Sequence, residues 1–65
     1  MASTFEVIER VGTSNKSSSD AIKAVVLQAN NEKAVSWFKV LEERGRITQE
    51  GEIEFQVKVN IGRKL

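Results

Sequence analysis

The chain lacks both cysteine and histidine. Without cysteine no disulfide can staple the fold, and without either residue no conventional zinc site can form. A chain of 65 residues buries only about 60% of the surface that its unfolded form exposes, so its core is thin. Oligomerisation is the remaining way to stabilise so small a scaffold. We therefore expect one domain, residues 1–65, that works as part of an oligomer.

Long apolar runs and an excess of one charge are also missing. The longest apolar stretch is far short of the about 20 residues that span a membrane, and the N-terminus has no signal-peptide pattern. Ten basic and nine acidic residues are interspersed and give a net charge of +1, which does not favour binding to nucleic acid. We expect a soluble, cytoplasmic protein that binds neither membrane nor nucleic acid, and the lack of cysteine agrees with a reducing compartment.

Catalytic constellations are sparse. The chain has no histidine base, no cysteine nucleophile, no G-x-S-x-G motif and no phosphate-binding P-loop. Acidic residues near the expected hairpin offer oxygen ligands for a hard cation such as calcium. No EF-hand-type loop accompanies them, so a solvated charged hairpin is the simpler interpretation. We expect a binding protein and not an enzyme.

The first part of the chain predicts a strand. Residues 4–11 alternate as a strand with one buried face does, and Gly12 is expected to end it. The expected core side carries Phe5, Val7 and Val11, and the expected polar side carries Glu6 and Arg10.

A helix is predicted over residues 18–31, after a polar linker. Ser17 or Ser18 can accept hydrogen bonds from the free amides of its first turn, and the asparagines at 30–31 are reasonable terminators. Leu27 points away from the apolar face, which is easier to explain if a second subunit covers it. The apolar face itself carries Ile22, Val25, Val26 and Ala29 at helical spacing.

Two further strands are predicted at 36–47 and 53–61, joined by a short loop over 48–51. The order is β-α-β-β, an α+β fold in which a three-stranded antiparallel sheet carries one helix on its apolar face. In the first of these strands Phe38, Val40 and Glu42 alternate with Trp37, Lys39, Leu41 and Glu43. The face away from the helix is expected to carry Glu6, Arg10, Trp37, Lys39, Glu43, Glu54, Gln56, Lys58 and Asn60.

Trp37 is the most informative residue, because alternation places the only tryptophan on the face opposite Phe38 and the helix. An exposed indole is a flat platform on which an aromatic ligand stacks. A second interpretation is that Trp37 packs in a subunit interface or beneath the loop after the helix. Gln56 has both a donor and an acceptor for the edge of a heterocycle, although a glutamine on a polar face is usually only solvated. Glu42 and Arg44 are likewise most simply interpreted as solvated side chains.

The ordered set of motifs resembles the dodecin family over nearly the whole chain. It comprises V-G-T-S at 11–14, an amphipathic helix, W-F-x-V at 37–40, R-G at 44–45 and F-Q-V at 55–57. The resemblance implies a hollow dodecamer whose subunits wrap a three-stranded sheet around one helix.

The resemblance also implies a ligand. In flavin-binding dodecins a pair of flavins stacks between tryptophans of symmetry-related subunits, and a glutamine of the last strand hydrogen-bonds the ring edge. These roles fall on Trp37 and Gln56, with Arg44 and Glu42 as weaker assignments near the ligand. The implied function is flavin storage with photoprotection, because the indole donates an electron to photoexcited flavin and quenches it. Riboflavin, FMN and lumichrome are the implied ligands, and coenzyme A binds to some bacterial members.

Two features depart from the family, and two rival functions stay open. Arg63 follows Gly62 where bacterial relatives carry an apolar residue, which alters a subunit contact or the inner surface of the shell. The helix region is about one residue shorter. The main rival is a shell of the same fold that binds calcium or coenzyme A without flavin. The second is a small nucleic-acid-binding sheet that stacks bases on Trp37, although it lacks a basic groove.

Overall fold

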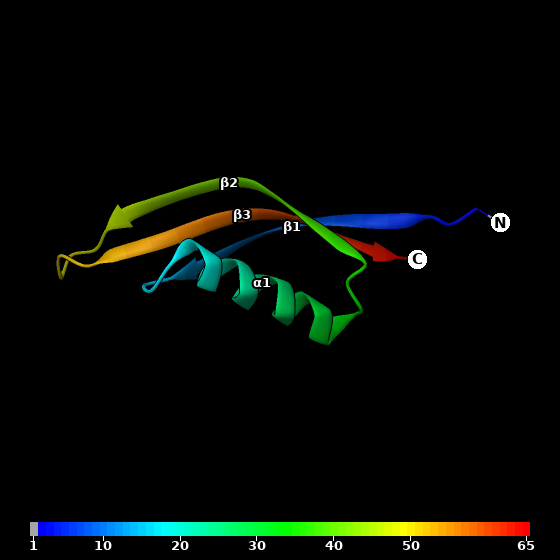
Figure 1. Cartoon of the computed structure of the whole chain (residues 1–65), viewed down its shortest axis with the longest axis horizontal. Helices are drawn as coiled ribbons and strands as arrows, with labels where there is room; N and C mark the ends of the chain where they lie inside the picture. Colours follow the sequence, from blue (N-terminus) through cyan, green and yellow to red (C-terminus); the bar gives the residue numbers. More distant parts are fainter. Residues whose placement is uncertain (1) are drawn as a thin grey trace.

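A computed structural model describes residues 2–65, which form a curved sheet with a helix on one face (Figure 1). The elements follow the order β1 (Phe5–Ser14), α1 (Ser18–Glu32), β2 (Trp37–Ile47) and β3 (Ile53–Lys64). The strand order is β1-β3-β2, and β3 pairs antiparallel with both neighbours. The predicted α+β fold with β-α-β-β order is confirmed.

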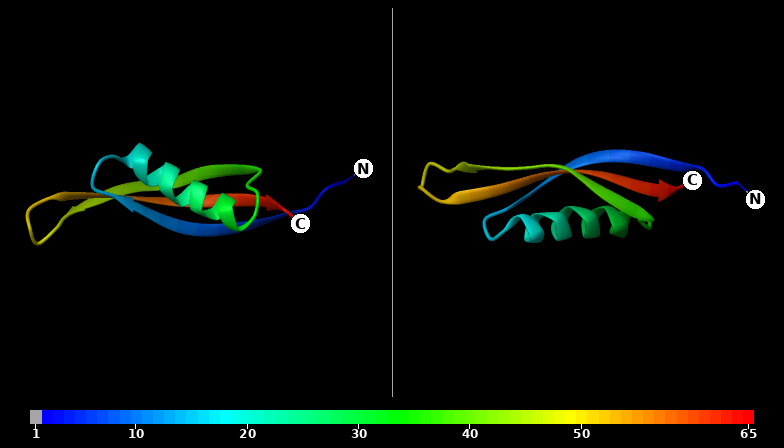
Figure 2. Two further views of the ribbon diagram at one scale, coloured as in Figure 1. Left: turned by 90° about the horizontal axis from the view of Figure 1, so that it is seen from below. Right: turned by 45° about the horizontal axis from the view of Figure 1, so that its top comes forward.

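The hairpin of β2 and β3 extends past the start of α1, while β1 begins and β3 ends at the other end of the sheet (Figure 2). The helix therefore covers only part of one face. Within residues 2–65 no helix combines the length and the apolar character that crossing a bilayer needs.

The core lies between α1 and the central strand β3. Because the middle of β3 is paired on both edges and covered on one face, the apolar residues there are the most buried in the sheet. On the helix, alanine at positions 21 and 29 lets the backbone approach the sheet closely. The predicted residues Ile22 and Val26 flank this contact and are only half-buried. The fully buried set comprises Ala21, Val25, Ala29, Val57, Val59 and Ile61.

The predicted faces of β1 are wrong. Val7, expected in the core, is 52% exposed, and Phe5 and Val11 are exposed on the same face away from α1. Ile8 lies opposite the buried Ile61, so Ile8 and every second residue from it face the helix. The helix-facing row of β1 is Glu6, Ile8, Arg10 and Gly12.

The charged residues of β1 that face the helix are ion-paired with the end of α1 and with β3. Arg10 donates two hydrogen bonds to the carboxylate of Glu32, at 2.8 and 2.6 Å, in a bidentate pair. Arg63, whose side chain is only 12% exposed, donates to Glu6 at 3.1 Å and lies 3.8 Å from Glu32. Lys33 also pairs with Glu6, at 3.3 Å. In this chain the departure at Arg63 therefore ties the end of α1 to β1 and β3.

Gly12 does not end β1, which continues to Ser14. A Cβ atom at Gly12 would lie 2.6 Å from the carbonyl oxygen of Ala21 and 2.8 Å from Cβ of Val25. Glycine is needed at this position because the helix backbone approaches the strand there. The conformational freedom of glycine plays no part.

The helix begins as predicted and ends later than predicted. Ser17 is the N-cap, and its Oγ accepts from the amide of Asp20 at 3.0 Å. The helix runs to Glu32, and within residues 2–65 only Gly51 has a positive φ, of 84°. Asn30 is therefore not a left-handed terminator. Its Oδ1 instead accepts from the amide of Val35 at 2.9 Å and shapes the loop that leads to β2.

The pair of Glu32 and Arg10 predicts acid sensitivity. The hydrogen bond from Arg10 lowers the pKa of Glu32 below its ordinary value of 4.5. A lowered folded-state pKa means stability that is present above the ordinary pKa and is lost as pH falls through the folded-state pKa. We expect the melting temperature to decrease as the pH is lowered below about 4.5. We expect the Glu32→Gln variant to have a lower melting temperature than the wild-type protein at pH 7. Its melting temperature should decrease less on acidification. Equal acid dependence in the two proteins, followed by circular dichroism, would contradict this.

A bulge in β2 overturns the predicted position of Glu42. The register shifts between Val40, opposite Val59, and Glu42, opposite Lys58, so that Leu41 is the extra residue. Side chains after the bulge therefore change faces. Glu42 lies on the face away from α1, and Glu43, expected there, lies opposite Val57 on the helix side.

Candidate functional site

Trp37 opens β2 on the face of the sheet away from α1. Its neighbour Phe38 lies opposite Ile61, whose side chain is buried under the helix, so Trp37 projects from the other side as alternation predicts. Trp37 lies opposite Gly62 and is 42% exposed. A Cβ atom at Gly62 would lie 2.5 Å from the indole atoms Cζ2 and Nε1. The indole therefore rests on the bare backbone of β3.

The surface beside the indole is apolar. Gly62 is also opposite Val7 of β1, so Trp37, Gly62 and Val7 form one row across the three strands. Phe5 extends this exposed apolar surface along β1, and Val11 is exposed on the same face beyond the charged Glu9. We call Phe5, Val7, Val11 and Trp37 the outer apolar surface. Sequence reasoning missed its β1 part because it assigned these residues to the core.

Gln56, Arg44 and Glu42 lie together on the same outer face, nearer the hairpin. Arg44 is opposite Gln56 and donates from Nε to Oε1 of Gln56 at 2.9 Å. Arg44 also approaches Glu42, with 3.5 Å between NH1 and Oε1. On its other side Gln56 donates from Nε2 to Oε1 of Glu54 at 2.9 Å. Three of the four predicted site residues are thus brought into one polar cluster.

The cluster fixes the orientation of the Gln56 amide. Arginine only donates and an ionised carboxylate only accepts, so the amide oxygen faces Arg44 and the amide nitrogen faces Glu54. A hydrogen bond from Arg46 lowers the pKa of Glu54, which keeps this acceptor charged. The amide retains one free N–H and one free lone pair. Gln56 therefore presents a donor and an acceptor side by side, in a fixed order.

Trp37 is separate from this polar cluster within one chain. Trp37 sits at the level of Gly62 and Arg44 at the level of Gln56, six residues earlier along β3. At a rise of about 3.3 Å per residue, the two levels are roughly 20 Å apart along the strand. A ring stacked on Trp37 does not reach Gln56 of the same chain.

Two hollows border α1 and β2 on the helix side. One, of about 330 Å³, is lined by Ile22, Lys23, Val26, Leu27 and Phe38. The other, of about 470 Å³, is bordered by Leu27, Val35 and Trp37, among others. Leu27 is 59% exposed and points away from the core, as predicted. Much of the apolar side-chain area is thus left uncovered by the chain itself.

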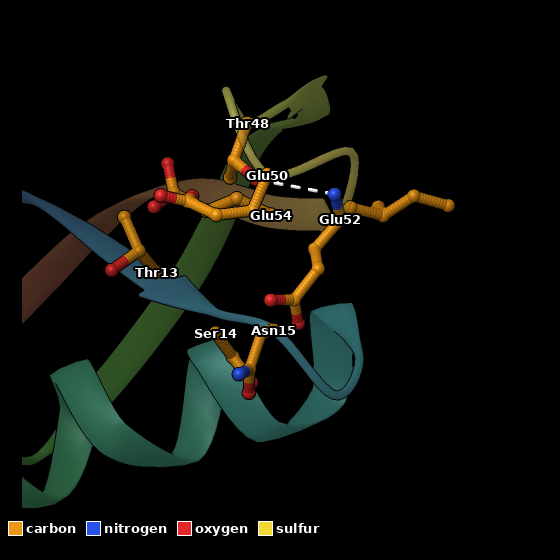
Figure 3. Close-up of a pocket in the computed structure, with 8 residues that line it drawn as sticks. Thr13, Ser14, Asn15, Thr48, Glu50, Glu52 and Glu54 are labelled. Atoms are coloured by element: carbon orange, nitrogen blue, oxygen red, sulfur yellow. Dashed lines mark hydrogen bonds between the residues drawn. The ribbon is translucent and has the colours of Figure 1, made fainter.

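An acidic hollow of about 270 Å³ lies where the end of β1 meets the hairpin (Figure 3). Glu50, Glu52 and Glu54 line it together with Asn15. In Figure 3 the Glu52 carboxylate is directed toward Asn15. Glu54 is already paired with Arg46, at 2.8 Å. Among residues 2–65 no three acidic side chains converge as ligands of a metal ion.

Comparison with known proteins agrees with this architecture. Residues 4–65 match the Dodecin family model. The chain is 35% identical over 66 residues to the dodecin of Thermus thermophilus, covering 100% of this chain and 96% of that protein. It superposes on the dodecin of Streptomyces davaonensis with a TM-score of 0.89 at 29% identity, covering 100% and 97% of the two chains.

A calcium dodecin of Mycobacterium tuberculosis, described as calcium chelating, has the same fold. Its TM-score is 0.87 at 24% identity, with 95% of this chain and 90% of that chain covered. The family model spans nearly all of the chain, and the fold matches solved dodecins along its full length. The chain therefore belongs to the dodecin family.

Proposed function

We propose that this protein binds flavin without turning it over, with each isoalloxazine ring stacked on Trp37. The observation that carries the proposal is the indole resting on Gly62, 42% exposed and in one row with the exposed Val7 across the outer face of the sheet. A planar aromatic ring placed there buries apolar area on both partners. Offset stacking adds about 0.5–1.5 kcal/mol beyond that burial.

We further propose that each site is completed by other subunits of a homododecamer. Trp37 and Gln56 of one chain lie at levels roughly 20 Å apart, so one flavin meets both only if they come from different subunits. A second indole, related by symmetry, closes the stack from the other side. The exposed Leu27 and the outer apolar surface give the assembly apolar area to bury.

The proposed role is flavin storage and photoprotection in the cytoplasm. An indole in contact with photoexcited flavin donates an electron to it, and return of that electron leaves both groups unchanged. The excitation is lost before reactive species form, and no bond is made or broken. Riboflavin and FMN share the isoalloxazine ring, and lumichrome has an alloxazine ring with the same planar tricyclic skeleton, so each fits this description.

A fluorescence titration separates this function from its rivals. We expect micromolar protein to quench the fluorescence of added riboflavin in a saturable way. Unquenched riboflavin would overturn the proposal. Saturable binding of calcium or coenzyme A by protein that leaves riboflavin unquenched would establish the rival shell without flavin.

Gln56 is expected to orient the bound ring and to contribute only a minor part of the binding affinity. Replacing it with leucine removes one donor and one acceptor from the ring edge, and neutral hydrogen bonds contribute about 0.5–1.5 kcal/mol each. We expect Gln56→Leu to weaken riboflavin and lumichrome alike, by at least about fivefold, because two such bonds contribute about 1 kcal/mol or more. The Gln49→Leu variant, in the exposed turn, is the matched control. Unchanged affinity in the Gln56→Leu protein would remove this residue from the site.

A further inference from the structure

Gly62 interrupts the side-chain pattern of β3 at one position. The outer face of this strand carries Glu54, Gln56, Lys58 and Asn60 at alternate positions, and then Gly62. Its φ is not positive, so no unusual backbone conformation calls for glycine there. Glycine within a strand often marks a close approach of another group. Here the approaching group is the indole of Trp37.

The space above Gly62 is completely taken by that indole. A methyl group added to Gly62 would meet Cε2, Cζ2 and Nε1, which belong to the six-membered and five-membered rings alike. The last two atoms would be 2.5 Å from it, whereas carbon atoms in ordinary contact are about 3.5 Å apart. The indole would have to rise by at least about 1 Å or swing off the strand.

We propose that Gly62 is a positioning residue for the ligand platform: its missing side chain sets the height and tilt at which Trp37 is presented. The proposal deepens the proposed function and rests on it for the identity of the ligand. In a site closed by two such indoles, any rise is applied from both sides. The gap between the two indoles, which holds the stacked flavin rings at van der Waals distance, then narrows or tilts.

The surrounding structure leaves Gly62 few other roles. Its carbonyl accepts from the amide of Ser36 at 2.8 Å, a backbone bond that alanine retains. Its other neighbour across the sheet, Val7, is more than half exposed and has room to move. The cost of a side chain at Gly62 should therefore be transmitted through the indole.

The test is the Gly62→Ala variant, with Asn60→Ala as the matched control two residues earlier on the same face. We expect Gly62→Ala to weaken riboflavin binding by about tenfold or more, and Asn60→Ala to change it by less than about threefold. Because the chain has one tryptophan and no tyrosine, its emission reports Trp37 alone. We expect that emission to shift in ligand-free Gly62→Ala protein. Wild-type affinity and emission in this variant would overturn the proposal.

Repeating the change in a Trp37→Ala background distinguishes positioning from a general structural role. We expect Gly62→Ala to lower the melting temperature when Trp37 is present and to leave it unchanged when Trp37 is absent. If Gly62→Ala fails to assemble, recovery of assembly by the double variant still supports the indole as the obstacle. Failure of both variants would overturn the proposal. If wild-type protein binds no riboflavin, the proposed function fails, yet the emission shift and the melting-temperature coupling still test positioning.

Discussion

The Trp37→Ala protein is expected to lose riboflavin binding by at least about 30-fold while remaining assembled. Truncating a central aromatic residue of an interface costs about 2 kcal/mol or more, which corresponds to about 30-fold in affinity. The loss is compounded because every subunit of a homo-oligomer carries the substitution, so both platforms of each stack disappear. Riboflavin fluorescence at increasing protein concentration measures it.

Trp37→Phe is the matched control for this loss. A phenyl ring retains a stacking face of smaller area, so we expect an affinity between those of the wild-type and Trp37→Ala proteins. Size-exclusion chromatography reports assembly in parallel. Loss of assembly in Trp37→Ala would support the second interpretation, in which the indole holds a subunit interface. Retained assembly with unchanged affinity would remove Trp37 from the ligand site altogether.

The Gly12→Ala protein is expected to be less stable by about 1–3 kcal/mol, the usual cost of overpacking a close contact. The added Cβ would press on the carbonyl oxygen of Ala21 and on Val25, and the oxygen belongs to the helix backbone. Relief requires α1 to move away from β1, which opens the layer that buries Val25 and Val57. Urea denaturation at matched subunit concentration measures the change.

Thr13→Ala is the control for this effect. Thr13 follows Gly12 in β1, but its exposed side chain points away from the helix, so we expect a change within about 0.5 kcal/mol. Gly12→Ala and Thr13→Ala proteins of equal stability would show that the helix tolerates a side chain at Gly12. The close approach would then not be what requires glycine there.

The predictability of the strands depended on where each one lies in the sheet. The middle of β3 is readable because Val57, Val59 and Ile61 lie under α1 in a strand that is paired on both sides, so their burial follows alternation. At the hairpin end, beyond the helix, Ile53 is 51% exposed although its parity is the same. β1 is an edge strand with apolar residues of both parities, and in the observed orientation Ile8 packs on the core, Gly12 meets the helix backbone and Arg10 pairs with Glu32. The alternation of apolar and polar residues along β1 does not reveal that ion pair. The apolar residues Phe5 and Val7 were consequently assigned to the wrong face.

The sequence indicates candidate residues for a site, but it does not indicate how they are arranged. Trp37 stood out because it is the only tryptophan and has the parity opposite to Phe38. The bulge at Leu41, which brings Glu42 beside Arg44, has no marker in the sequence. The distance between Trp37 and Gln56 depends on strand register, which the sequence alone did not reveal. Gly62 lies just past the predicted strand over 53–61, and the structure, in which β3 runs to Lys64, is what places this glycine inside a strand and under the indole.

Native mass spectrometry of the protein with added riboflavin tests the central claim most directly, because it counts subunits and ligands in the same particle. The account predicts an assembly of twelve copies of the 7.3 kDa chain that retains riboflavin, and an assembly of the same size without ligand for Trp37→Ala. A wild-type monomer, or an assembly from which riboflavin is absent at saturating concentration, would contradict it.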